Sequence, residues 1–188
     1  MSTTRSLLAL SLLAASWVAS ASNWQTVPGE STLRFVGEAQ GESFDGGFKD
    51  FSAHIAFDAD NLESASFDVT IVLASADSQN EERDELMQGA DFFDSAAQSK
   101  ARYRATRFER LADGKFRALG ELTLKGKTRP VALDFTWQVN GADATLDGSA
   151  ALSRLAFDVG IGDWTDTELI GDTVRVLTTL HLRATSAP

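Results

Sequence analysis

The side chains best suited to metal binding or nucleophilic catalysis are few and scattered in this sequence. The chain has 188 residues, two histidines and no cysteine. His54 and His181 lie in different strand-like segments, and neither belongs to a short-spaced histidine pair of the kind that holds a metal. The lack of cysteine excludes disulfides, Fe–S clusters, thiolate zinc sites and thiol catalysis. We therefore expect no metal site and no catalytic residue.

Other catalytic motifs are missing or incomplete. No G-x-S-x-G elbow occurs, so a hydrolase triad has no position for its nucleophile. Residues 58–63 begin like a calcium loop but carry Leu62 and Glu63 where an oxygen ligand and a glycine are needed. One acidic cluster could supply a carboxylate pair for acid–base chemistry, although charge on a polar helix is usually solvated. It comprises Asp77, Glu81, Glu82, Asp84 and Glu85.

The distribution of charge narrows the choice of partners. With 17 Lys+Arg against 27 Asp+Glu and a net charge of −10, the chain is a poor candidate for binding nucleic acid. Its basic residues gather in one segment, as Lys100, Arg102, Arg104, Arg107 and Arg110. That segment is either a docking site for an anionic head group or an acidic partner, or a solvated outer face.

These side chains must be positioned mainly by β-strands, because apolar and polar residues alternate along most of the chain. The alternation is strongest over residues 67–73, 131–139 and 174–182, and weaker over 32–38, 48–57, 101–108, 116–124 and 145–152. One helix is expected over residues 78–87, with Ser78 or Asn80 as its N-cap and Gly89 as its stop. The pattern fits a barrel or a sandwich. Long strands with one uniformly apolar face favour an all-β, eight-stranded antiparallel barrel with one short helix.

The apolar faces of these strands would line the barrel interior. The inward set is Leu33, Phe35, Phe67, Val69, Ile71, Leu133, Phe135, Trp137, Leu146, Val176 and Leu180. An eight-stranded barrel can be filled by its side chains or can hold one slender ligand. The alternation is the same in both cases, so both interpretations stay open.

The first 21 residues have the layout of a secretory signal peptide. Arg5 precedes an apolar run of about twelve residues, which is short for a membrane span, and Ala19 and Ala21 occupy the two positions that a signal peptidase reads. We expect a cleaved signal peptide over residues 1–21, an exported protein that is periplasmic or secreted, and one domain over residues 22–188. An uncleaved anchor is the alternative.

Two motifs resemble those of a known family. The first runs from Gly120 to Val131 as GELTLKGKTRPV, and the second is NEERDEL from Asn80, followed by DFFD from Asp91. In this order and separation they resemble the YceI-like family of exported proteins that bind lipids or polyisoprenoids. Trp24 is similar to a residue of the family's opening strand, and the resemblance extends over about residues 23–184.

The resemblance implies a lipocalin-like barrel with an elongated apolar cavity. The helix and the segment that carries Phe92 and Phe93 would lie beside the barrel, and both phenylalanines would join the ligand-binding lining. Arg154 and Trp164 would lie at the cavity mouth. No cofactor is implied beyond a bound isoprenoid or fatty lipid.

Three functions are compatible with these observations. The leading hypothesis is a non-enzymatic periplasmic carrier of an isoprenoid, such as a polyprenyl or quinone-like molecule, or of another amphiphilic lipid. The second is a filled barrel that docks a membrane or redox partner through its arginine-rich strand or its helix. The third is a lipid-modifying enzyme with a carboxylate at the barrel mouth. The sequence leaves a homodimer open as well.

Overall fold

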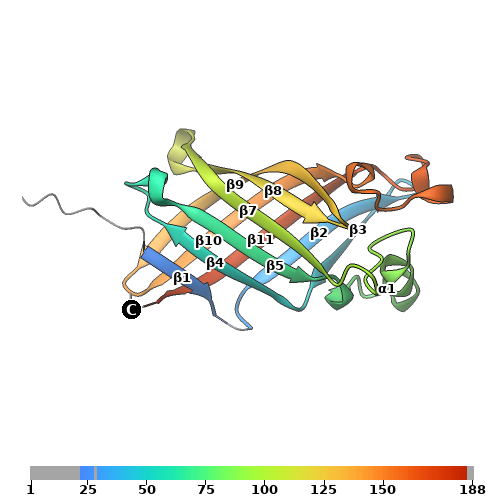
Figure 1. Cartoon of the computed structure of the whole chain (residues 1–188), viewed down its shortest axis with the longest axis horizontal. Coiled ribbons are helices and arrows are strands. Elements are labelled where there is room, and N and C mark those ends of the chain that lie inside the picture. Colours follow the sequence, from blue (N-terminus) through green and yellow to red (C-terminus); the bar gives the residue numbers. More distant parts are fainter. Residues whose placement is uncertain (1–21, 28, 186–188) are drawn as a thin grey trace, which may run out of the picture.

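The computed structural model describes residues 22–27 and 29–185, and the expected signal peptide over residues 1–21 lies outside this range. The protein is mostly β, a closed eight-stranded antiparallel barrel with one helix (Figure 1). Its strands are β1 Ser22–Thr26, β2 Thr32–Ala39, β3 Glu42–Phe48, β4 Phe51–Phe57, β5 Ser66–Val72, β6 Ala76–Asp77, β7 Lys100–Arg110, β8 Phe116–Leu124, β9 Lys127–Asn140, β10 Asp143–Ser153 and β11 Thr173–Ala184. The helix α1 is Glu81–Gln88. None of the helices in the described ranges has the length and apolar character needed to cross a bilayer.

Eleven strand segments occupy eight positions in the barrel wall. The ring runs β1-β4-β5-β7-β8-β9-β10-β11, and pairing of β1 with β11 closes it. β2 follows β1 along the same edge of β11, β3 pairs with β2, and β6 pairs with β3. Because β1 pairs with β11 from Trp24–Ala184 to Thr26–Leu182, the sheet closes on itself and forms a barrel, not a sandwich.

Alternation along each strand separates the interior from the outer surface. On β7, Ala101, Tyr103 and Ala105 are buried while Arg102 and Arg104 are exposed. This confirms the strand expected there and places its arginines on the outer face. One expected strand is corrected: residues 48–57 do not form a single strand, because β3 ends at Phe48 and β4 begins at Phe51.

Of the two N-caps expected for the helix, Ser78 and Asn80, the structure has Asn80. Asn80 is the N-cap and its side chain accepts a hydrogen bond from the Arg83 N–H, while Gly89 ends the helix as expected. Ser78 lies before the helix, where its hydroxyl donates to Asp84 Oδ1 at 2.6 Å. Arg83 Nε in turn donates to Ser78 Oγ at 2.8 Å. These bonds fix the start of α1 against the barrel at β6.

Candidate functional site

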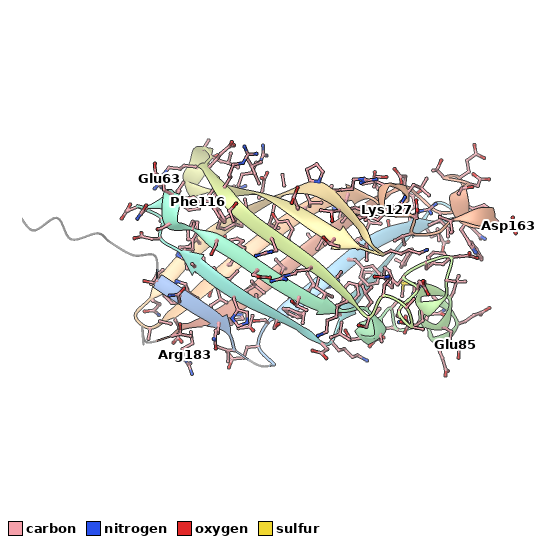
Figure 2. The ribbon with its side chains drawn as sticks, in the orientation of Figure 1. Glu63, Glu85, Phe116, Lys127, Asp163 and Arg183 are labelled. Carbon is pink, nitrogen blue, oxygen red and sulfur yellow. The ribbon has the colours of Figure 1, made fainter. Side chains whose placement is uncertain are left out.

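One end of the barrel is closed by a cluster of aromatic rings, which we call the aromatic plug. The plug consists of Trp24, Phe57, Phe67, Phe108, Phe116, Phe135 and Trp137. Phe57 lies at its centre, with ring centroids 5.1 Å from Phe116, 5.3 Å from Phe135 and 5.0 Å from Trp137. Most of these pairs are edge-on, the geometry that aromatic quadrupoles favour. The plug fills the interior at this end with aromatic rings, and Figure 2 places Phe116 there, far from Glu85 and Asp163.

Beyond the plug, the interior contains two apolar cavities. One cavity of about 110 Å³ lies next to the plug and is bordered by Phe67, and a second of about 140 Å³ lies toward α1. The two share part of their lining, so they adjoin inside one barrel. The shared residues are Leu33, Ile71, Leu122, Leu152 and Val176.

Most of the residues expected to line the barrel face these cavities. They are Leu33, Phe35, Phe67, Val69, Ile71, Phe92, Phe93, Leu133, Leu146, Val176 and Leu180. Phe135 and Trp137 point inward as well, but the structure places them in the plug, outside the lining of the two cavities. Alternation of apolar and polar residues shows whether a side chain faces the interior, but it does not give the height of that side chain along the barrel axis. The sequence could therefore not distinguish residues that line the cavities from residues of the plug.

Several lining residues were missing from the expected set. Leu122, Leu124 and Leu152 lie on strands that the alternation had located, so their inward faces could have been included. Phe44 and Phe48 come from β3, most of which carried no clear strand pattern. Their rings reach Phe35 at centroid distances of 6.4 and 5.5 Å. They extend an aromatic wall toward the end of the barrel near α1, opposite the plug, which we call the open end.

Tyr103 carries one of the few polar groups against the cavities, and that group is satisfied. Its hydroxyl is 3.3 Å from the Ala118 carbonyl oxygen and 3.2 Å from that of Val131. Burial raises the pKa of Tyr103 well above its usual range, which keeps the phenol neutral. The ring fits because position 120 is glycine, where a Cβ would lie 2.5 Å from the Tyr103 ring.

Arg154, which was expected at the cavity mouth, has a structural role at this end of the barrel. It borders the cavity near α1, but it is only 3% exposed. All five of its N–H groups donate to backbone carbonyls, those of Val159, Gly160, Trp164, Ile170 and Gly171, at 2.7–3.1 Å. Burial lowers the pKa of Arg154, and nearby Asp172 opposes this. With every donor used, Arg154 holds the loops of the open end together and has none left for a ligand.

Trp164 also supports this end of the barrel. It is partly buried, and its ring centroid lies 5.6 Å from that of Phe92. It is absent from the lining of both cavities. Trp164 therefore stands behind Phe92, and Phe92 is the ring that faces the cavity.

The arginine-rich strand is partly neutralised by its neighbour. Arg102 Nε donates to Asp68 Oδ1 at 2.8 Å, and Arg104 Nε lies 3.7 Å from the other oxygen of the same carboxylate. The hydrogen bond from Arg102 holds the pKa of Asp68 below its usual range. Within the described ranges no three His, Cys, Asp or Glu side chains are grouped closely enough to hold a metal.

Known proteins resemble this chain both in sequence and in fold. The sequence matches the YceI-like domain family over residues 24–182. A "UPF0312 protein" of Ectopseudomonas mendocina is 32% identical over 120 residues, which span 61% of this chain and 63% of that relative. BcnA of Burkholderia cenocepacia has a crystal structure that is 32% identical, with a TM-score of 0.79 over 85% of this chain and 99% of that one. A polyisoprenoid binding domain from Saccharophagus degradans, implicated in plant cell wall breakdown, shares the fold at 18% identity, with a TM-score of 0.67 over 86% of this chain and 98% of that domain.

Proposed function

This chain belongs to the YceI-like family, and on that premise we propose that it is a non-enzymatic binding protein or carrier of an isoprenoid or another amphiphilic lipid. The observation that carries the proposal is the pair of adjoining apolar cavities between the aromatic plug and α1. A prenyl or acyl tail has no hydrogen-bonding groups, so a wall of aliphatic and aromatic carbon is all that it needs.

The energetics of such a site are favourable. Burial of apolar surface contributes roughly 25 cal/mol per Å², so a few hundred Å² of tail offset the cost of ordering the ligand. The plug closes one end of the barrel, and the tail would therefore enter with its head group last. Its terminal carbons, those farthest from the head group, would lie against Phe67. The likeness of the fold to a polyisoprenoid binding domain supports the same class of ligand.

The cellular location forms part of the proposal. The layout of residues 1–21 supports export to the periplasm or beyond, with residues 22–188 as the mature domain. An extracytoplasmic carrier would shield a water-insoluble tail between membranes, and a barrel with an apolar interior and a charged outer wall suits that task.

A cavity-filling substitution tests the proposal. Val176 borders both cavities, and Val176→Phe should fill the space where they adjoin and lower affinity for geranylgeraniol at least tenfold. Leu177→Phe is the matched control, since Leu177 is the next residue of β11 and contributes to the outer wall. Delipidated protein would be titrated with the alcohol, and native mass spectrometry would report the stoichiometry.

The results separate a hollow barrel from a filled one. One geranylgeraniol per chain, lost in Val176→Phe and kept in Leu177→Phe, supports the carrier. Absence of binding by the unsubstituted protein to geranylgeraniol, a prenyl quinone and a fatty acid would contradict it. The filled-barrel interaction module would then be the better interpretation.

A further inference from the structure

The barrel wall has a seam on one side, between the β1–β4 and β2–β3 pairs. In the described residues, the pairing of β1 with β4 ends at Gln25–His54, and the pairing of β2 with β3 begins at Arg34–Gly47. Between these pairs the chain bonds to β11 instead: the Val27 N–H donates to the His181 carbonyl at 2.8 Å, and the Ser31 hydroxyl bonds the same residue. The register explains the seam, because eight residues, 26–33, separate these two pairs on one side and six residues, 48–53, separate them on the other.

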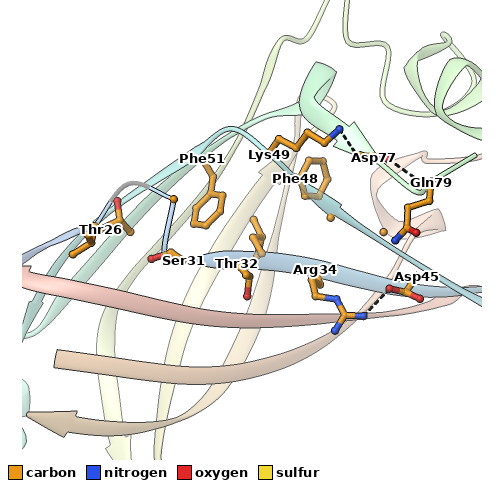
Figure 3. A pocket seen from close by; sticks show the side chains of 15 residues that line it. Thr26, Ser31, Thr32, Arg34, Asp45, Phe48, Lys49, Phe51, Asp77 and Gln79 are labelled. Atoms are coloured by element: carbon orange, nitrogen blue, oxygen red, sulfur yellow. Dashed lines mark hydrogen bonds and ion pairs between the residues drawn. The ribbon is translucent and has the colours of Figure 1, made fainter. Parts of the chain in front are cut away.

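A pocket of about 350 Å³ lies over this seam (Figure 3). Its outer part is polar, with Thr26, Ser31 and Thr32 beside two ion pairs. Its inner part includes three apolar residues that also line the barrel cavities. Leu33 borders both cavities, Phe48 borders the one near α1, and Phe51 borders the one near the plug. These three residues therefore lie between the seam pocket and the cavities of the barrel.

The seam carries two cations, each matched by an anion. Arg34 lies 2.6 Å from Asp45, and Lys49 forms a close ion pair with Asp77. The formal charge of the four groups is zero. A guanidinium has five N–H groups and an ammonium three, and each described ion pair uses one of them. The remaining donors suit carbonyl or hydroxyl oxygens, while the two aspartates repel an added anion.

The open end near α1 offers less to a head group. The charged residues that line its cavity are Glu38 and Arg154, and Arg154 has committed all five donors to carbonyls. Lys125 bonds the carbonyls of Ala90 and Asp158 at 2.6 and 2.9 Å, and Lys127 pairs with Asp158 at 2.6 Å. Cations at this end thus hold the loops in place.

We propose that the seam is the head-group site and that it takes an uncharged, oxygen-bearing head group such as that of a quinone or a prenyl alcohol. This inference rests on the proposed lipid-binding function. The head group accepts hydrogen bonds from Arg34 and Lys49, and the tail passes Leu33, Phe48 and Phe51 into the barrel. A phosphorylated head group is disfavoured because Asp45 and Asp77 already neutralise both cations.

Removing the two anions tests this assignment. Affinities for geranylgeraniol and geranylgeranyl monophosphate, which share one tail, would be measured for the unsubstituted protein and for the double variant Asp45→Asn, Asp77→Asn. The unsubstituted protein should prefer the alcohol. In the double variant the preference should move toward the phosphate by about tenfold or more, because two cations are released for charge-assisted hydrogen bonds.

A matched ion pair away from the seam provides the control. Asp143→Asn breaks the 2.9 Å pair with Arg183, which is similarly exposed and lies at the plugged end (Figure 2). It should leave the preference unchanged, and thermal melting would verify that all variants fold. An unsubstituted protein that binds the phosphate as tightly as the alcohol, or an unmoved preference in the double variant, overturns the seam assignment and leaves the carrier function standing. Failure of both probes to bind the unsubstituted protein contradicts the carrier function itself.

Discussion

At the scale of single residues, Arg154 shows how one buried side chain organises a region. Its guanidinium donates hydrogen bonds to five backbone carbonyls of the segment over residues 159–171. Buried carbonyls without a donor are costly, so five bonds from one guanidinium stabilise five positions at once. The fit is close: a Cβ on Gly160 would lie 2.3 Å from an Arg154 nitrogen, and Gly160 has a φ of +76°.

Substitution of Arg154 should therefore lower stability rather than remove a ligand contact. We expect Arg154→Met to lower the free energy of unfolding by about 3 kcal/mol or more, because buried carbonyls lose charged donors. Arg154→Lys should recover part of this loss, since an ammonium has three donors. Urea unfolding measures the change. Near-normal stability of Arg154→Met, together with lost ligand affinity, would show instead that Arg154 acts in ligand binding.

At the scale of elements, the wall strands and the plug divide the interior into a binding space and a floor. Phe67 stands at the boundary, because it belongs to the plug and also borders the neighbouring cavity. Its ring centroid is 5.2 Å from that of Phe135 and 4.8 Å from that of Phe108. The position of this floor limits the tail length that the barrel can enclose.

Truncation of the floor should change the preferred tail length. Phe67→Ala should extend the cavity and shift preference among saturated fatty alcohols toward chains several carbons longer. Phe116→Ala is the control, because Phe116 is equally buried in the plug and outside the cavity lining. Both variants should lose about 3–5 kcal/mol of stability. An equal length preference in the two variants would show that the floor does not lie at Phe67.

At the scale of the whole molecule, charged pairs across neighbouring strands stabilise the outer wall. Asp68 on β5 bonds Arg102 on β7, and Asp134 on β9 bonds Arg117 on β8 at 2.5 and 2.8 Å. These hydrogen bonds hold the pKa values of Asp68 and Asp134 below the usual aspartate value. Each strand of the ring β1-β4-β5-β7-β8-β9-β10-β11 has two hydrogen-bonded neighbours, so such pairs act between adjacent strands of the wall.

This arrangement predicts the direction of acid sensitivity. A carboxyl whose folded pKa is lowered stabilises the fold above its unfolded pKa, near 4, and that contribution is lost as pH falls through the folded value. The melting temperature should thus fall below about pH 4. Asp134→Asn should melt lower than the unsubstituted protein at pH 7, and the difference should shrink as the pH falls below about 4. Asp163→Asn, in an exposed loop, is the control substitution. A constant difference for Asp134→Asn at all pH values would contradict this account.

The sequence by itself determined the strand class, the helix and the family. Alternation is a local property, and it located both faces of strands such as β7, β9 and β11 because side chains there point alternately to either face. Gly89 marked the end of α1 for an equally local reason, while Ser78 and Asn80 both stayed open as its N-cap. The paired motifs indicated the family that the comparison confirms.

Only the tertiary structure decided what the inward side chains do. Whether Phe135 and Trp137 form a plug or Leu33 and Val176 line a cavity depends on height along the barrel axis, which strand stagger sets. Arg154 reads as an available cation in sequence, because the carbonyls that it bonds belong to a loop folded around it. The seam likewise arises from a register difference between distant pairs, Gln25–His54 and Arg34–Gly47. Non-local packing fixes all three, and no local pattern of residues encodes it.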